Sequence, residues 1–336
     1  MGRRTVAPAG FDFAPDRSAQ LVGIAKLAAG SDVLEAKRRV EYRDLETRRY
    51  IGRCSGAKPF DWTINPYRGC EFGCKYCYAR YTHEFMELRD QRQFEEIIFA
   101  KSWSEAEFRN ELARVPRGQA ICLGTATDPY QPAERRFGLT RCMLKVISEG
   151  RGQRLWVTTK SDLVARDLDI LQSIATRNVV QVSMTVTTVD ESLARKVEAF
   201  APRPSLRLAA VRKLVDGGIR TGVLAHPIMP LINDGERALD RLAKAAAESK
   251  ACFLSAAVLF LKPCAQAAFF PFLEEHFPHL VRRYKERYEK SAYITGEYPA
   301  LISERVKRLK EKYGFHERYD EYRPELWLEQ DQMSLF

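Results

Sequence analysis

Short strand-like segments alternate with helix-like segments along the middle of the chain, and this alternation strongly limits the folds that the chain can adopt. The apolar, β-branched segments cover residues 60–65, 97–101, 120–127, 155–160, 179–188 and 221–228. A helix-like segment follows each of them, so crossovers connect successive strands and the strands run parallel. The pattern predicts an α/β fold of six β/α units, in which functional residues lie at the carboxyl ends of the strands.

Capping signals place several of these helices. Ser104 and Glu107 form a capping box that opens a helix to Val115, and Gly150 ends a helix over 140–149. Further helices are predicted over 78–88, 162–175, from 190 onward, 204–216 and 233–249, and residues 251–261 are predicted to form one more buried strand.

The chain divides into three predicted regions. Residues 1–54 are arginine-rich and are predicted to form a basic N-terminal extension with one helix near 32–40, and residues 55–265 hold the β/α units. Residues 266–336 are predicted to form a C-terminal helical region, because apolar side chains recur there at helical spacing. These side chains are Leu273, Phe277, Leu280, Tyr284 and Tyr288, followed by Leu301, Ile302, Val306 and Leu309.

The loop after the first strand holds three cysteines, Cys70, Cys74 and Cys77, in the spacing C-x-x-x-C-x-x-C. Clustered thiolates are the ligands of iron–sulfur clusters, and a cubane held by three of them leaves one iron open to another ligand. Zinc sites usually combine two cysteine pairs, and ferredoxins place a fourth cysteine close by, whereas the next cysteine here is Cys122. A disulfide is not expected in a chain without a secretory signal. The spacing therefore favours an open iron–sulfur cluster.

The formal net charge of the chain is +10. A positive charge of this size favours an anionic partner such as DNA, RNA or another phosphate-bearing molecule. A basic surface that is simply solvated explains it equally well. No apolar run reaches the length of a membrane span, and no signal peptide opens the chain. We therefore expect a cytoplasmic monomer without a membrane partner.

The cysteine spacing, with Tyr76 directly before the third cysteine, resembles that of radical S-adenosylmethionine (radical SAM) enzymes. The resemblance implies an open, partial (β/α)6 barrel that binds a [4Fe-4S] cluster and S-adenosyl-L-methionine (SAM). It also implies that the open iron binds the amine and carboxylate of SAM. An external electron donor of the flavodoxin or ferredoxin type would then drive cleavage of SAM to a 5′-deoxyadenosyl radical, which takes a hydrogen atom from a substrate.

Four further segments, 124–134, 158–161, 183–188 and 209–230, together with Tyr78, resemble the spore photoproduct lyase-like group of this superfamily, often labelled "DNA repair photolyase". The resemblance places Tyr76 beside the SAM adenine. Tyr78 either relays a hydrogen atom or packs against the cluster loop. The other implied SAM contacts are Thr125, Thr127, Lys160 and Ser183, with Arg195 for the SAM carboxylate.

The sequence departs from this group at one position. The lyase has a hydrogen-donating cysteine near the end of the third strand, where this chain has Thr125 and Ala126. Thymine-dimer repair by the same route is therefore not expected. Of the remaining cysteines that follow the motif, Cys122 and Cys142 are interpreted as packed thiols, and Cys252 and Cys264 as core or surface thiols.

His226 ends the sixth predicted strand, at the expected active-site edge. It is interpreted either as a proton donor or SAM contact, or as a hydrogen-bonded structural histidine. For the whole chain, the leading hypothesis is a radical SAM enzyme with an unidentified substrate for which nucleic acid is a candidate. The alternatives are a nucleic-acid-binding protein with a purely structural cluster and, less well supported by a chain of this size, an electron carrier.

Overall fold

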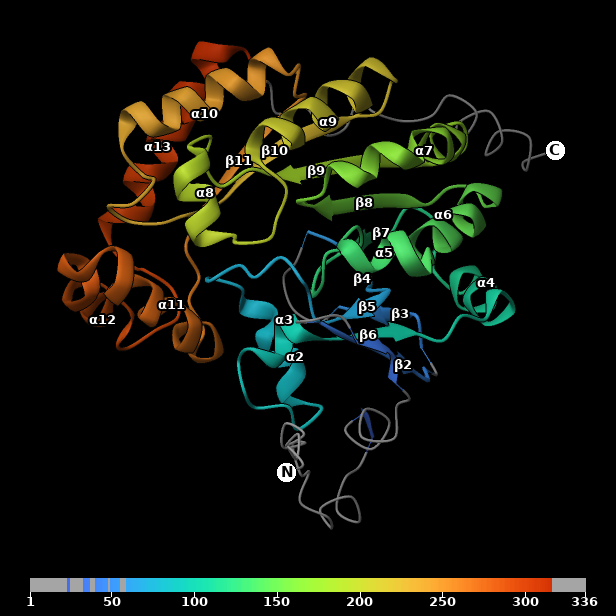
Figure 1. The fold of residues 1–336 in the computed structure, drawn as a ribbon. Coiled ribbons are helices and arrows are strands. Elements are labelled where there is room, and N and C mark those ends of the chain that lie inside the picture. Colours follow the sequence, from blue (N-terminus) through green and yellow to red (C-terminus); the bar gives the residue numbers. More distant parts are fainter. Residues whose placement is uncertain (1–22, 25–32, 37–39, 48, 55–58, 316–336) are drawn as a thin grey trace, which may run out of the picture.

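A computed structural model describes residues 23–24, 33–36, 40–47, 49–54 and 59–315. Its main sheet has seven strands in the order β11-β10-β9-β8-β7-β4-β3. Six of them are parallel, and β3 pairs antiparallel with β4 at one edge. The sheet is an open partial (β/α)6 barrel, as the sequence predicts (Figure 1). The strands are β3 (Ile51–Arg53), β4 (Trp62–Ile64), β7 (Ala120–Leu123), β8 (Arg154–Thr159), β9 (Val179–Thr185), β10 (Thr221–Ile228) and β11 (Leu254–Val258).

The predicted second strand of the barrel lies elsewhere. Residues 97–101 do form a strand, β6 (Ile97–Lys101), but it belongs to a separate four-stranded sheet with the order β1-β2-β6-β5. The sixth parallel strand of the barrel is β11, within the buried strand predicted after the β/α units. All five residues of β6 are buried, so its sequence carries no pattern that separates one sheet from the other.

The helix predicted near residues 32–40 is wrong. Val33–Ala36 is strand β1 and Glu41–Leu45 is strand β2, while residues 37–39 lie outside the described part of the chain. β2 runs parallel to β6, and Tyr42 and Leu45 of β2 are buried there. Pairing with a strand that is distant in the sequence therefore determines that this segment is extended. Strands from the predicted extension therefore join both sheets, and the boundaries at 54/55 and 265/266 stay predictions.

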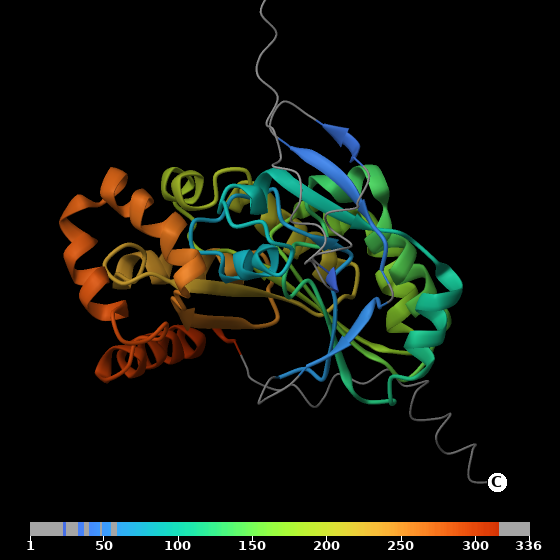
Figure 2. The same ribbon diagram turned by 90° about the horizontal axis from the view of Figure 1, so that it is seen from below.

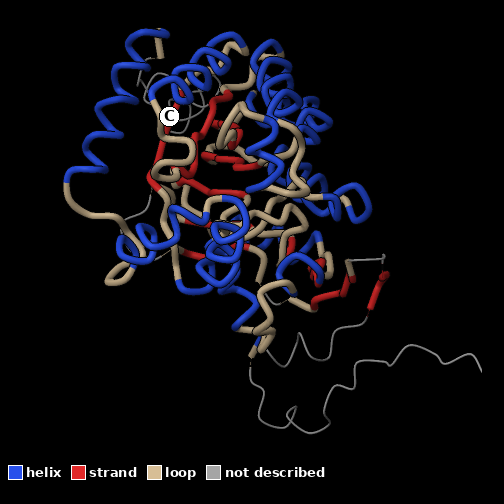
Figure 3. Tube along the Cα trace, turned by 60° about the vertical axis from the view of Figure 1, so that its left-hand side comes forward, coloured by secondary structure: helices blue, strands red, loops and turns tan. Residues whose placement is uncertain are grey.

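Helices form an outer layer around the barrel strands (Figure 3), and a large apolar core lies between the two layers. The helix predicted over 78–88 is only a 3-10 turn at Tyr78–Arg80 followed by the short α2. The helices that precede the C-terminal region are α2 (Tyr81–Glu84), α3 (Gln93–Glu96), α4 (Glu105–Ala113), α5 (Pro132–Phe137), α6 (Leu139–Glu149), α7 (Leu168–Ala175), α8 (Glu191–Val197), α9 (Pro204–Asp216) and α10 (Glu236–Glu248).

The C-terminal region is helical as predicted, with α11 (Pro263–His276), α12 (Val281–Tyr288) and α13 (Glu297–Tyr313). Seen from below (Figure 2), these helices lie at the β11 end of the barrel, opposite α4 and α6. Tyr284 and Tyr288 are buried as the helical stripe predicts, but Leu301 is exposed. Within the described residues, no helix combines the length and the apolar character that crossing a membrane requires.

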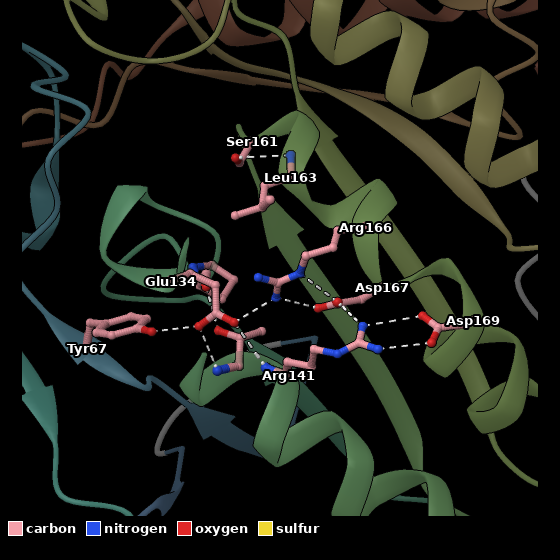
Figure 4. Close-up of polar contacts among 10 residues, drawn as sticks. Tyr67, Glu134, Arg141, Ser161, Leu163, Arg166, Asp167 and Asp169 are labelled. Atoms are coloured by element: carbon pink, nitrogen blue, oxygen red, sulfur yellow. Dashed lines mark hydrogen bonds and ion pairs between the residues drawn. The ribbon is translucent and has the colours of Figure 1, made fainter. Parts of the chain in front are cut away.

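A buried ion network joins the small sheet to the helices of the barrel (Figure 4). Tyr67 on β5 (Tyr67–Arg68) donates its hydroxyl to Glu134 Oε2 at 2.6 Å, and Arg166 Nη2 donates to Glu134 Oε1 at 2.8 Å. Arg166 also pairs with the buried Asp167, which Arg141 contacts from α6. Because each buried carboxylate has a cationic partner and further donors, the network is electrostatically satisfied.

We predict that Tyr67→Phe lowers the free energy of unfolding by about 1.5–3 kcal/mol, the contribution of a hydrogen bond to a charged group. Burial raises the pKa of the Tyr67 phenol, which therefore stays protonated and acts as the donor to Glu134. Urea unfolding at neutral pH measures the change. Tyr313→Phe removes a similar bond to Asp240, which is only partly buried, and should change the free energy of unfolding by less than about 1 kcal/mol. Equal effects of the two variants would contradict the assigned role of the network.

Candidate active site

The cysteine loop passes between the two sheets. After β4 ends at Ile64, the chain enters the small sheet at β5 and then turns back through the three cysteines. Gly69 has a φ of 82°, and a Cβ there would lie 2.8 Å from the Ile97 carbonyl oxygen, so the turn requires glycine. The backbone of the loop then forms hydrogen bonds on both sides. The Cys70 N–H donates to the Phe94 carbonyl, and the Lys75 N–H donates to the Val197 carbonyl, both at 2.9 Å. The loop is thereby fixed between two distant parts of the chain.

A cavity of about 360 Å³ lies against this loop, at the carboxyl ends of several barrel strands. All three cysteines line it, as do loops that follow β7 and β8 and the ends of β10 and β11. Residues of the cysteine loop and the β7 loop in its wall include Cys70, Phe72, Cys74, Tyr76, Cys77, Tyr78, Thr125, Ala126, Thr127 and Asp128. Residues of the other barrel strands in its wall include Thr158, Thr159, Lys160, Thr185, Leu224 and His226.

Two of the residues expected at the SAM site do not line this cavity. Ser183 is buried on β9, two positions before the lining residue Thr185 and therefore on the same face but deeper in the barrel. Arg195 is exposed on α8, where its Nη1 donates to the Ala199 carbonyl at 2.7 Å. Lys160 is the one lysine or arginine in the described lining of the cavity.

The two predicted threonines are already engaged within the protein. Thr127 donates its hydroxyl to the Gly69 carbonyl at 2.5 Å and accepts from Gln131 Nε2 at 2.8 Å. Asn65 Nδ2 lies 3.0 Å from Thr125 Oγ1, so that hydroxyl too is positioned by the loop before the cysteines. These contacts connect the end of β7 to the cysteine loop, and the threonines therefore shape the cavity wall.

A buried ion pair beneath Tyr76 was not predicted from the sequence. Glu198 accepts hydrogen bonds from the Tyr76 hydroxyl and, at 2.7 Å, from Thr187 Oγ1. Its other oxygen lies 2.6 Å from Arg207 Nη2, and both side chains of this pair are 1% exposed. Because the backbone of Glu198 also forms a β-bridge with Cys74, the pair supports the cysteine loop directly.

One sequence signal could have revealed Arg207. It occupies the buried face of α9 together with Ala210, Val211 and Leu214, at the spacing of an amphipathic helix. An arginine at a core position of such a stripe needs a buried acidic partner. Glu198, which follows α8, carries no comparable signal.

The charge of Lys160 depends on this pair and on the cysteines. Its Nζ lies 5.6 Å from the centre of the Tyr76 ring. Burial lowers the pKa of Lys160, but the charges of Cys74 and Glu198 outweigh burial and hold that pKa above its usual value. Lys160 is therefore a cation that faces the cavity at neutral pH. Its backbone N–H donates to Asp128 Oδ2 at 2.7 Å, which fixes the end of β8.

The three thiols suit a cluster that carries positive charge. Burial raises the pKa of Cys70, and it raises the pKa of Cys74 to about 12, so metal ions are needed to hold these groups as thiolates at neutral pH. Among the described residues, no three His, Cys, Asp or Glu side chains are arranged to hold a single metal ion. In a cubane each thiolate binds a different iron, and the observation that fits such a group is that all three cysteines line one cavity.

The other residues of interest have structural partners. His226 Nε2 lies 3.3 Å from Ser255 Oγ, and burial lowers the pKa of His226 to about 4, so this side chain is neutral at pH 7. Cys122 is buried, with its Sγ 3.9 Å from Thr158 Oγ1. Cys264 is also buried and donates to the Tyr78 carbonyl at 3.5 Å.

Residues 64–243 of the chain match the family described as "Radical SAM superfamily". The chain belongs to the radical SAM superfamily. It is 34% identical over 260 residues to an uncharacterized protein of Mycobacterium tuberculosis, which covers 77% of this chain and 76% of that relative. It is also 30% identical over 185 residues to an uncharacterized protein of Methanocaldococcus jannaschii, which covers 54% of this chain and 64% of that relative.

The fold of this radical SAM protein is similar to that of spore photoproduct lyase. A mutant of that lyase with bound AdoMet and dinucleoside spore photoproduct matches with a TM-score of 0.57 and 17% sequence identity, over 80% of this chain and 78% of the lyase. The predicted superfamily, the partial barrel and the likeness to the lyase are thereby confirmed. The likeness at this identity is one of fold.

Proposed function

We propose that this protein is a radical SAM enzyme that holds a [4Fe-4S] cluster on Cys70, Cys74 and Cys77 and binds SAM in the adjoining cavity. The observation that supports this proposal most strongly is that all three cysteines line one cavity at the carboxyl ends of the barrel strands. When bound, the cluster supplies the electron that cleaves SAM to a 5′-deoxyadenosyl radical, which abstracts a hydrogen atom from the substrate. A partner of the flavodoxin or ferredoxin type delivers that electron.

The residues of the cavity have distinct roles in this proposal. The Tyr76 hydroxyl is engaged by Glu198 and Thr187, so the face of its ring is what remains for the SAM adenine. Lys160 holds the SAM carboxylate by charge, in place of the exposed Arg195. Thr125, Thr127 and the deeper Ser183 shape the SAM side of the cavity.

Tyr78 stands at the opening of the cavity, and we propose that it faces the substrate. Its side chain is 42% exposed, and its hydroxyl donates to the Thr125 carbonyl at 2.7 Å. A phenol at this position suits the relay of a hydrogen atom between SAM-derived and substrate-derived radicals. Tyr78→Phe removes the relaying phenol and the hydrogen bond to Thr125 together, so a variant that keeps its iron content and SAM cleavage but loses reaction with the substrate supports the relay.

For the substrate we propose a nucleic acid. The support is the net charge of +10 and the likeness in fold to a lyase whose structure contains a dinucleoside photoproduct. Repair of thymine dimers by the route of that lyase is not proposed, because Thr125 and Ala126 occupy the place of a donor cysteine.

The experiment that tests the enzyme proposal is anaerobic reconstitution with iron and sulfide, followed by dithionite and SAM. We predict that SAM changes the electron paramagnetic resonance spectrum of the reduced cluster and that 5′-deoxyadenosine accumulates. The reason is that three cysteine ligands leave one iron open to the amino and carboxylate groups of SAM. An unchanged spectrum at saturating SAM, with no 5′-deoxyadenosine, would instead favour a nucleic-acid-binding protein with a structural cluster. Lys160→Met should raise the SAM concentration needed for the change, whereas Arg195→Met should not.

A further inference from the structure

Aromatic rings gather where the cavity opens to solvent. Phe260, which lines the cavity, stacks on Tyr293 with ring centroids 4.4 Å apart and an interplanar angle of 30°. Tyr78 also neighbours Phe260, at 6.1 Å between ring centroids. Tyr293 nevertheless remains 63% exposed. A stacked pair that leaves so much of one ring in water offers a flat apolar surface to a further ring.

A cation is held at the same opening. Lys262 Nζ lies 4.4 Å from the centroid of the Tyr81 ring and 5.8 Å from that of Phe260. Aromatic faces attract an ammonium group without neutralising its charge. The opening therefore combines a flat apolar surface with a fixed positive charge.

A second, larger cavity of about 740 Å³ continues from this opening. It lies between β11, the edge strand of the barrel sheet, and α13. Three residues belong to the walls of both cavities: Ala257, Val258 and Leu259. Tyr293 lines the second cavity and Phe260 the first, so their stacked rings stand at the junction of the two. The cavity at the cysteines and the one along α13 therefore adjoin along β11, and we call the two together the path.

The charges along this path are mainly positive. α13 contributes Lys307 and Lys310, together with one acidic residue, Glu311. Lys262, beside the Phe260 ring, adds a further cation near the junction. The wall between the lysines is apolar, with Val258, Ile302 and Val306 among its residues. Flat rings followed by spaced cations are the arrangement by which proteins bind single-stranded nucleic acid.

We propose that this path binds a single strand of DNA, with an unpaired base stacked on Tyr293 and phosphates contacted by Lys262 and Lys307. The inference rests on the proposed function, because it places the strand so that a neighbouring nucleotide enters the cavity at Tyr78. A single strand is required because the bases of a duplex are already stacked on one another and cannot cover the ring. DNA is favoured over RNA because the wall beside the rings is apolar and suits a sugar without a 2′-hydroxyl.

The test measures binding of a fluorescently labelled oligothymidine to the reconstituted protein by anisotropy, at about 50 mM salt where phosphate contacts are strong. Tyr293→Ala is expected to weaken binding by roughly fivefold to a hundredfold, the range for loss of one base-stacking side chain. Lys307→Ala should weaken binding and reduce the slope of log affinity against log salt by about 0.7. The matched controls are Leu206→Ala and Lys213→Ala, exposed positions on α9 away from the path, and they should change neither quantity.

Three results would overturn the proposal: binding unaffected by Tyr293→Ala, tighter binding of a duplex or of oligouridine, or equal competition by an acidic aromatic peptide. Cleavage of SAM by the reduced enzyme without any oligonucleotide is measured on the same samples. Tyr293 lies outside the SAM cavity lining described above, so its variant should retain that cleavage. An unaltered protein that cleaves SAM but does not bind the oligothymidine refutes this inference alone, whereas absence of SAM cleavage in the unaltered protein refutes the proposed function.

Discussion

Replacing Cys70, Cys74 and Cys77 together with alanine is expected to abolish the cluster and all SAM cleavage. The unaltered protein should hold about four irons in one cubane, with the brown absorbance of such clusters. The three thiols line one cavity, and the fit of this site to a cluster depends on them alone. Iron and sulfide analysis, the visible spectrum and the yield of 5′-deoxyadenosine should all fall to background.

The control for the triple variant is Cys252→Ala, which removes a thiol outside the cavity lining. It should keep the full iron content and the full yield of 5′-deoxyadenosine. Far-ultraviolet circular dichroism checks that the triple variant retains its fold, since the loop backbone is held by bonds to Phe94 and Val197 that the substitutions do not remove. A brown chromophore that survives in the triple variant would place the cluster elsewhere.

Glu198→Gln is expected to lower the free energy of unfolding by about 3–5 kcal/mol, because it leaves Arg207 charged and unpaired in the core. Both side chains are 1% exposed, so water cannot replace the lost partner. The Tyr76 hydroxyl also loses its charged acceptor, and the Glu198 backbone bridges Cys74, so the reconstituted variant should bind less iron. Urea unfolding and iron analysis of the same preparations measure the two effects.

A double variant separates the ion pair from other effects. Glu198→Gln combined with Arg207→Met should be less destabilising than the sum of the two single changes, because no unpaired charge remains. The surface pair of Arg109 and Glu105 provides the contrast, since Glu105→Gln should cost less than about 0.5 kcal/mol. If Glu198→Gln also lowers the free energy of unfolding by less than about 1 kcal/mol, the buried ion pair does not stabilise the cysteine loop.

The sequence predicted the structure best at residue types that have few structural roles, such as clustered cysteine, proline and glycine. The cysteine spacing located the cavity wall, and the helix over 204–216 coincides with α9 because proline at its start and two glycines after its end mark both limits. The sheet that contains β6 could not be inferred, since five consecutive buried residues fit either sheet. The strand β1 was predicted as part of a helix, and β2 was not predicted because its partner β6 is distant in the chain.

The candidate site shows a similar division. Residues next to the cysteines or at strand ends, such as Tyr76, Thr125 and Lys160, do line the cavity. Arg195 was assigned from a likeness of position, but the rotation of α8 about its axis decides which side chains face inward, and Arg195 faces solvent. Glu198 was missed because it follows α8 outside any periodic pattern, and Arg207 was missed although it stands in the buried stripe of α9.

The cysteine loop lies between two segments that are far apart in the sequence. This separation determines when the loop can fold during synthesis. One wall, at Phe94, is synthesised soon after the cysteines, but the other, at Val197 and Glu198, follows Cys77 by more than a third of the chain. Folding during synthesis proceeds from the N-terminus, so the loop remains open while the barrel strands leave the ribosome. Under the proposed function, iron delivery therefore acts on chains that already extend past Glu198, and chains that terminate before it lack the wall that closes the loop.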